Sequence, residues 1–233
     1  MTRPTWRQSL DLGLTVAMAV VICLLGWRLY SHQHPQSPPP SRFEVPSAPV
    51  PLKDAFLLGD HNAPLVLLMY ADFECGACRL FERDAWPAVQ RDYLEKRRLV
   101  FAFQPFPLQS RGEAAIEEAA LARCAGHQGK FWEAHDALYG SVGLDVASKR
   151  EAVSAATGLS QPTLSACVVE ERSHVRRSVA EANRLGIEGT PSFLIGSLDG
   201  SGRLRAVVAH RGVAKGSKWL TNLLEPANES SQR

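Results

Sequence analysis

The chain has 233 residues, enough for one domain of moderate size with appendages. Apolar residues make up 45% of the chain and charged residues 21%, which is ordinary for a globular protein. The 26 Lys and Arg against 24 Asp and Glu leave a net charge of +2, which argues against a nucleic-acid or polyanion partner. The chain has five cysteines, and the four beyond Cys23 are an even number, which suits an oxidising compartment. These four are Cys75, Cys78, Cys124 and Cys167.

An uncharged apolar run extends from Leu12 to Trp27 and is closed by Arg28. Flanking apolar residues lengthen it toward the ~20 residues that a membrane span needs. We therefore predict a transmembrane signal-anchor over residues 10–30, after a short cytoplasmic tail over residues 1–9, with the lipid bilayer as a partner. A cleaved signal peptide is the alternative, but no small-residue cleavage site follows the apolar core.

Proline recurs between His32 and Pro51. Proline lacks a backbone N–H and does not fit a helix interior or a central strand. We therefore predict an extended, Pro-rich linker over residues 31–54.

Two cysteines stand two residues apart, at Cys75 and Cys78, where a buried strand over Leu65 to Tyr70 is expected to meet a helix beginning near Arg79. The free N–H groups at a helix start stabilise a thiolate, and a thiolate is the species that attacks disulfides. This placement predicts a redox pair with Cys75 as nucleophile and Cys78 as resolving thiol. A plain stabilising disulfide and a pair of metal ligands are the alternatives.

The elements around this motif form a strand–helix–strand unit. Phe56 to Leu58 predicts a short edge strand, and Leu99 to Gln104 predicts the strand that follows the helix. Pro87 should kink that helix or start a new one. A helix with a cysteine at its start between two parallel strands is a βαβ unit.

The region from Arg111 to Leu185 is expected to be helical nearly throughout, with breaks at Thr157-Gly158 and at Glu170. The strand pattern then returns. We expect strands over Ser192 to Gly196 and Leu204 to His210, a closing helix over Ser217 to Leu224, and a polar tail over residues 225–233.

Three segments carry a resemblance to a known family. The segment Asp72 to Cys78 (DFECGAC) resembles the active-site segment of the DsbA-like thiol–disulfide oxidoreductases of the thioredoxin superfamily. Gly189 to Phe193 (GTPSF) resembles the segment that faces the cysteine pair in that superfamily, and Phe131 to Asp136 (FWEAHD) resembles part of its helical insert. The resemblance implies an α/β thioredoxin-like fold over residues 55–224, with a helical subdomain inserted at about residues 108–186.

The resemblance also implies the site. Catalysis would rest on Cys75 and Cys78, and substrate would lie along Gly76, Ala77, Thr190 and Pro191, with a cis Thr190–Pro191 bond. The chain departs from its relatives at Met69, where many carry a buried acid, and at Gly76-Ala77, where many DsbA-type oxidases carry a histidine. Backbone N–H groups and Arg79 then remain to stabilise the Cys75 thiolate, with Glu74 acting against them.

Cys124 and Cys167 lie on separate predicted helices of the insert. We expect a structural disulfide between them, because an exported domain would not keep two free thiols. Two independent buried residues or a second redox pair are the alternatives. The histidines are scattered, without the close-spaced pair of a structural zinc site, and no metal site is expected.

Together with the predicted anchor, the resemblance implies a membrane-anchored, extracytoplasmic thiol–disulfide oxidoreductase of a bacterial inner or cell membrane, with its catalytic domain in the periplasm or outside the cell. Its partners would be cysteine-containing protein substrates and a membrane redox protein that recycles the pair, and no bound cofactor is implied. The direction of electron flow stays open. Two rival functions also stay open: a metal-binding module or metallochaperone that uses the same thiols, and a non-redox thioredoxin-fold chaperone.

Overall fold

The computed structural model describes residues 16–28 and 40–231, which fall into two separate units. In the first, residues 16–28 are helical. No helix in the described residues combines the length and the apolar character that a membrane crossing requires. The predicted span over residues 10–30 extends beyond this helix on both sides, so its two ends lie outside the described residues. The predicted tail over residues 1–9 and the linker up to residue 39 lie outside them as well.

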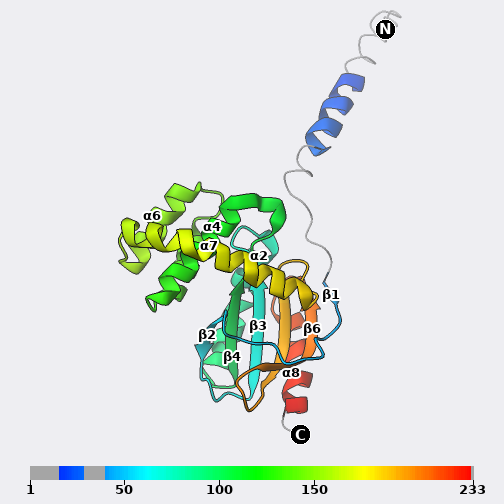
Figure 1. Cartoon of the computed structure of the whole chain (residues 1–233). Helices are drawn as coiled ribbons and strands as arrows, with labels where there is room; N and C mark the ends of the chain where they lie inside the picture. Colours follow the sequence, from blue (N-terminus) through cyan, green and yellow to red (C-terminus); the bar gives the residue numbers. More distant parts are fainter. Residues whose placement is uncertain (1–15, 29–39, 232–233) are drawn as a thin grey trace, which may run out of the picture. The chain divides into compact units, whose positions relative to one another are not determined.

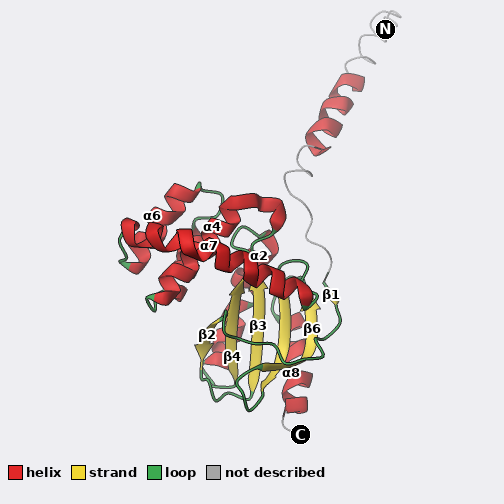
Figure 2. Ribbon diagram, viewed as in Figure 1, coloured by secondary structure: helices red, strands yellow, loops and turns green. Residues whose placement is uncertain are grey.

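In the second unit the described strands form one mixed sheet in the order β1-β6-β5-β3-β4-β2 (Figures 1 and 2). The interior neighbours β3 and β4 run parallel, and the other neighbouring pairs are antiparallel. The strands are β1 (Ser41–Arg42), β2 (Phe56–Gly59), β3 (Leu65–Ala71), β4 (Leu99–Pro105), β5 (Ser192–Leu198) and β6 (Leu204–Arg211).

β3 and β4 are buried along their whole length and belong to the hydrophobic core. The helices on the sheet are α2 (Gly76–Asp84), α3 (Trp86–Val89), a π-helical turn over Gln90–Leu94, and α8 (Lys218–Ser231). Pro87 lies in the first turn of α3, so it starts a new helix as its missing N–H predicts. The β3–α2–β4 connection is the expected βαβ unit.

The helical subdomain lies at one end of the sheet, between β4 and β5 in the sequence (Figure 1). It contains a short 3₁₀ turn over Gln109–Arg111, followed by α4 (Gly112–His127), α5 (Phe131–Gly140), α6 (Val146–Thr157) and α7 (Gln161–Arg184). The predicted break at Thr157-Gly158 is confirmed: Gly158 adopts φ 73°, a left-handed conformation that glycine allows without steric cost. The expected thioredoxin-like fold with a helical insert is thus confirmed.

The predicted break at Glu170 is wrong, because α7 is one uninterrupted helix of 24 residues that includes this position. Glutamate is a good helix former. A continuous stripe of buried residues on one face of α7 holds both halves of the helix against the domain: Leu164, Val168, Val175, Val179 and Ala182.

Parts of the predicted linker and of the predicted tail belong to the folded domain. Residues 40–54, predicted as linker, lie on the domain: β1 pairs with β6, and Val50 is buried and bridges to Leu204. Proline excludes central strands but tolerates this edge position. The predicted tail begins inside α8, which continues to Ser231 because Leu223, Leu224 and Ala227 form one buried stripe.

Candidate active site

Cys75 lies at the N-terminus of α2, where the chain turns out of β3. The turn is held by Asp72, whose side chain accepts the Glu74 N–H at 2.8 Å while its backbone carbonyl accepts the Cys75 N–H at 3.0 Å. A second carboxylate oxygen of Asp72 accepts the Leu108 N–H at 2.8 Å. Asp72 therefore fixes the loop that carries the nucleophile against the loop that follows β4.

Hydrogen-bond donors surround the Cys75 sulfur on the side of α2, and the Cys75 thiol itself donates to the Thr190 carbonyl oxygen. The pKa of Cys75 is lowered from 9.0 to about 6. The largest cause is a hydrogen bond from the Cys78 thiol, which burial of the site opposes. The contact with Thr190 and the backbone N–H groups of Cys78 and Ala77 add to it, as expected at a helix start. Cys75 is therefore mostly thiolate at neutral pH.

Cys78 has the opposite character. It is fully buried at 0% exposure, against 6% for Cys75, and both residues carry free thiols. Burial raises the pKa of Cys78 well above its ordinary value, and the hydrogen bond to Cys75 raises it further. The environment thus makes Cys75 the reactive sulfur and keeps Cys78 as a protonated donor behind it.

The Thr190–Pro191 bond is cis, as predicted, and precedes β5, the antiparallel neighbour of β3. It places the Thr190 carbonyl oxygen 3.4 Å from the Cys75 sulfur. Of the four predicted substrate-contacting residues, Gly76 is exposed, whereas Ala77, Thr190 and Pro191 are buried. The Ala77 side chain packs into the core, and Gly76 is the exposed residue next to Cys75.

A buried polar cluster lies behind the pair, between α2 and α5. His135 is buried, with its Nε2 3.6 Å from a carboxylate oxygen of Glu82, and Tyr139 packs against its ring at 4.9 Å between centroids. Burial raises the pKa of the Tyr139 hydroxyl, and the nearby Cys78 adds to this effect. His135 is thus a buried histidine packed behind the cysteine pair.

Two buried carboxylates, Asp72 and Glu118, support the site without being predicted from the sequence, and Glu118 binds Lys149. The role of Asp72 could have been predicted from the sequence, since an aspartate just before a helix commonly accepts a hydrogen bond from the backbone N–H of the second residue after it. No local sequence pattern predicts the contact between Lys149 and Glu118, because 31 residues separate them and only the packing of two helices brings them together.

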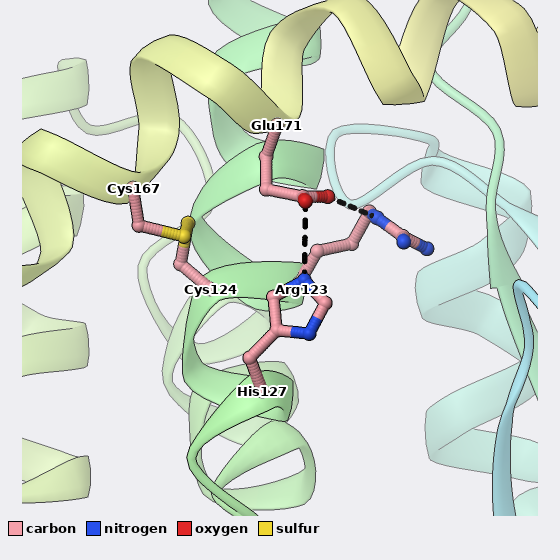
Figure 3. The surroundings of a disulfide bond; sticks show 5 residues. All are labelled: Arg123, Cys124, His127, Cys167 and Glu171. Carbon is pink, nitrogen blue, oxygen red and sulfur yellow. Dashed lines mark hydrogen bonds and ion pairs between the residues drawn. A yellow bond between two sulfur atoms is a disulfide. The ribbon is translucent and has the colours of Figure 1, made fainter.

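Cys124 of α4 and Cys167 of α7 form a disulfide, as predicted (Figure 3). One helical turn beyond Cys167, Glu171 accepts hydrogen bonds from Arg123 at 2.6 Å and from His127 at 3.1 Å. The bond and these ion pairs link the same two helices. In the described residues no group of three His, Cys, Asp or Glu side chains is placed to hold a metal ion.

Comparison with known proteins agrees with this architecture. A family model described as Thioredoxin matches residues 52–201. Disulfide bond formation protein D of Bacillus subtilis is 25% identical over 88 residues, which are 38% of this chain and 40% of that protein. Na(+)/H(+) antiporter NhaA 1 of Mycolicibacterium vanbaalenii is 27% identical over 207 residues, which are 84% of this chain and 33% of that protein. The chain thus spans less than half the length of these two curated relatives.

Two solved structures extend the likeness to most of the chain. Wolbachia pipientis alpha-DsbA1 superimposes with a TM-score of 0.66 at 25% identity, covering 78% of this chain and 94% of that one. Oxidised BdbD from Bacillus subtilis superimposes with a TM-score of 0.65 at 17% identity, covering 80% and 100%, and shares the fold. The family match, the cysteine pair at the start of α2 and the cis Thr190–Pro191 bond lead to one conclusion: this protein belongs to the thioredoxin family and is DsbA-like.

Proposed function

We propose that this protein is a thiol–disulfide oxidoreductase that exchanges disulfides with cysteine-containing proteins through Cys75 and Cys78. One observation carries the proposal. The Cys75 sulfur lies at the start of α2 with a pKa of about 6, against the Thr190 carbonyl, while Cys78 is buried directly behind it. A plain structural disulfide has no need of a stabilised thiolate, and a stabilised thiolate beside a second thiol is the arrangement that disulfide exchange requires.

In the oxidising direction the enzyme begins as the Cys75–Cys78 disulfide. A substrate thiolate attacks the Cys75 sulfur, forms a mixed disulfide, and releases Cys78, which takes up a proton. A second substrate thiolate then attacks the substrate sulfur of the mixed disulfide and releases Cys75 as thiolate. The substrate gains one disulfide and loses two electrons, which the two enzyme thiols now hold.

The same atoms support the reverse direction, in which Cys75 attacks a substrate disulfide and Cys78 resolves the mixed disulfide. The lowered pKa of Cys75 favours the oxidising direction, because it stabilises the reduced enzyme and makes Cys75 the better leaving group. Substrate would pair through its backbone with Thr190, beside the exposed Gly76. A membrane redox protein would then reoxidise the pair.

The proposed location is extracytoplasmic, with residues 10–30 as a single membrane anchor. The uncharged apolar run from Leu12 to Trp27 supports the anchor. The Cys124–Cys167 disulfide supports an oxidising compartment, since such bonds are rare in a reducing cytosol.

The proposal is tested with a reduced peptide that carries two cysteines and fluoresces differently on oxidation. The oxidised wild-type protein should oxidise it, and Cys75→Ser should abolish the reaction. Reduced Cys78→Ser, mixed with a disulfide-bonded peptide, should accumulate a mixed disulfide through Cys75 that is visible on a non-reducing gel.

Cys23→Ser is the matched control, since it removes a thiol outside the site, and it should behave as wild type. Retained oxidation by Cys75→Ser, or a mixed disulfide through another cysteine, would overturn the assignment.

A further inference from the structure

Three charged side chains meet between the active-site loop and the helical subdomain. The ammonium group of Lys149 in α6 donates hydrogen bonds to Glu118 of α4, at 2.7 Å, and to Glu74. The side chains of Lys149 and Glu118 are each 3% exposed and that of Glu74 is 20% exposed. Glu74 is the residue immediately before Cys75. A buried charge thus contacts the neighbour of the nucleophile.

Lys149 remains charged in this position. Burial lowers its pKa, but the hydrogen bonds to Glu118 and Glu74 outweigh burial, and the pKa is raised overall. A buried ammonium group is stable only when it is paired, and here it has two carboxylates. Burial raises the pKa of Glu118, so Glu118 also depends on Lys149 to keep its charge.

The consequence for Cys75 is electrostatic. A carboxylate next to a thiolate disfavours the thiolate and raises its pKa. Two donors from the helical subdomain bind the Glu74 carboxylate: Lys149, and the Gly143 N–H at 3.3 Å. The carboxylate is therefore drawn toward the subdomain, and the adjacent positive charge offsets its own.

The other ionisable groups near this site do not supply that compensation. Arg79, the cation expected from the sequence, is exposed, and in the described residues no ion pair joins it to Glu74. Asp72 and Cys78 flank Cys75 in the same turn, and neither carries a positive charge. Arg111 lies 3.8 Å from Asp72 and offsets that carboxylate. Among the contacts of the described residues, Lys149 is the cation bound to Glu74.

We propose that Lys149 is a positioning residue of the redox site, which orients and neutralises Glu74 and so keeps Cys75 acidic. The inference rests on the proposed function and names a residue of the helical subdomain that tunes it. Among the contacts of the described residues, Lys149 binds Glu74 and Glu118 and not the Cys75 sulfur, so the proposed effect passes through Glu74.

The test measures the pKa of Cys75 in the reduced full-length protein, from the pH dependence of thiolate absorbance and of alkylation by iodoacetamide. Lys149→Met should raise the pKa by about one unit and slow alkylation at pH 5 about tenfold. The equilibrium with glutathione should shift toward the oxidised protein. Lys130→Met is the matched control, because it removes an exposed lysine that pairs with Glu133 in the same subdomain, and it should leave the pKa unchanged.

A second pair of variants separates charge from folding. In the Glu74→Gln background the carboxylate is gone, so Lys149→Met should shift the pKa by less than a third of its effect in the wild type. A merely structural role for Lys149 predicts the same shift in both backgrounds, and that result would overturn the proposal. Lys149→Gln, which keeps a hydrogen-bond donor without the charge, serves if Lys149→Met does not fold. An unchanged pKa in folded Lys149→Gln would equally overturn it.

The two proposals fail differently. A wild-type Cys75 that titrates at its ordinary value of 9.0, with no exchange activity, would remove the proposed function itself. A wild-type protein that exchanges disulfides with an acidic Cys75, combined with an unshifted Lys149→Gln, would remove only the role of Lys149.

Discussion

The sulfur of Cys75 lies 3.4 Å from the carbonyl oxygen of Thr190, although 115 positions separate the two residues in the sequence. The contact joins the start of α2 to the turn before β5. It forms because β3 and β5 are antiparallel neighbours in the sheet, so the end of β3 lies beside the start of β5. We therefore expect a substrate that reaches the sulfur to meet the Thr190 backbone as well.

The first prediction concerns the reactivity of the two cysteines. Limiting iodoacetamide should label Cys75 in the reduced protein and leave Cys78 almost unlabelled, because Cys78 is fully buried and its pKa is raised. The labelling rate of Cys75 should rise with pH and reach half its maximum near pH 6, since its pKa is about 6. Peptide mapping by mass spectrometry at several pH values measures both, and preferential labelling of Cys78 would contradict the assignment.

Removal of the Cys78 thiol should weaken this acidity. Its hydrogen bond is the largest cause of the low Cys75 pKa, so Cys78→Ala should raise that pKa toward 9.0. Thiolate absorbance during a pH titration measures the shift. Cys124→Ser with Cys167→Ser removes two cysteines outside the site and should leave the titration where it is in the wild type.

The stability of the reduced protein should depend on pH in a defined direction. The pKa of Cys75 falls from 9.0 to about 6 on folding, so the unfolded state binds more protons between these values. This contribution is fully present above pH 9 and is lost as the pH falls through 6. Its upper bound is about 4 kcal/mol for three pKa units. Urea unfolding at pH 5, 7 and 9 should show this trend in the reduced wild type, whereas Cys75→Ser should lack it.

Loss of the Cys124–Cys167 disulfide should destabilise the domain without abolishing disulfide exchange at Cys75 and Cys78. The bond closes a loop of 43 residues, for which chain entropy gives about 4 kcal/mol. Urea unfolding of Cys124→Ser with Cys167→Ser should show a loss of roughly 2–5 kcal/mol, and peptide oxidation should continue at pH 7. If the double variant folds but cannot oxidise the peptide, the bond is a second redox pair.

Residues 1–30 should remain in the mature protein as its anchor. The apolar run ends at Arg28 without a small-residue cleavage site, so signal peptidase should not release the domain. Fractionation of cells that express the full chain should place the intact protein with the membranes, and deletion of residues 1–30 should remove it from them. A soluble product that begins near Ser31 would contradict the prediction.

Local patterns in the sequence determined most of the elements and the reactive pair. The apolar run from Leu65 and the periodicity after Arg79 predict the strand and helix that flank Cys75. A strand or helix with a buried face needs apolar residues at these spacings, whichever part of the chain packs against it. The cis Thr190–Pro191 bond followed from the resemblance, since local chemistry favours the trans form.

The sequence was least informative where long-range packing overrides local signals. Glu170 has no local feature that separates a helix break from an exposed helical position, and only the buried face of α7 decides between them. The proline-rich segment before Leu52 joins the sheet because β6 offers it an unpaired edge. No local pattern describes that edge.

The electrostatics of the site were decided by the tertiary structure alone. From the sequence, Glu74 acts against the Cys75 thiolate, and Arg79 is the one nearby cation that the local sequence offers. Lys149, 75 residues away, reaches it only after α6 has packed beside the active-site loop. A thiolate responds to every charge within several ångströms, and which charges lie there is a property of the packed chain.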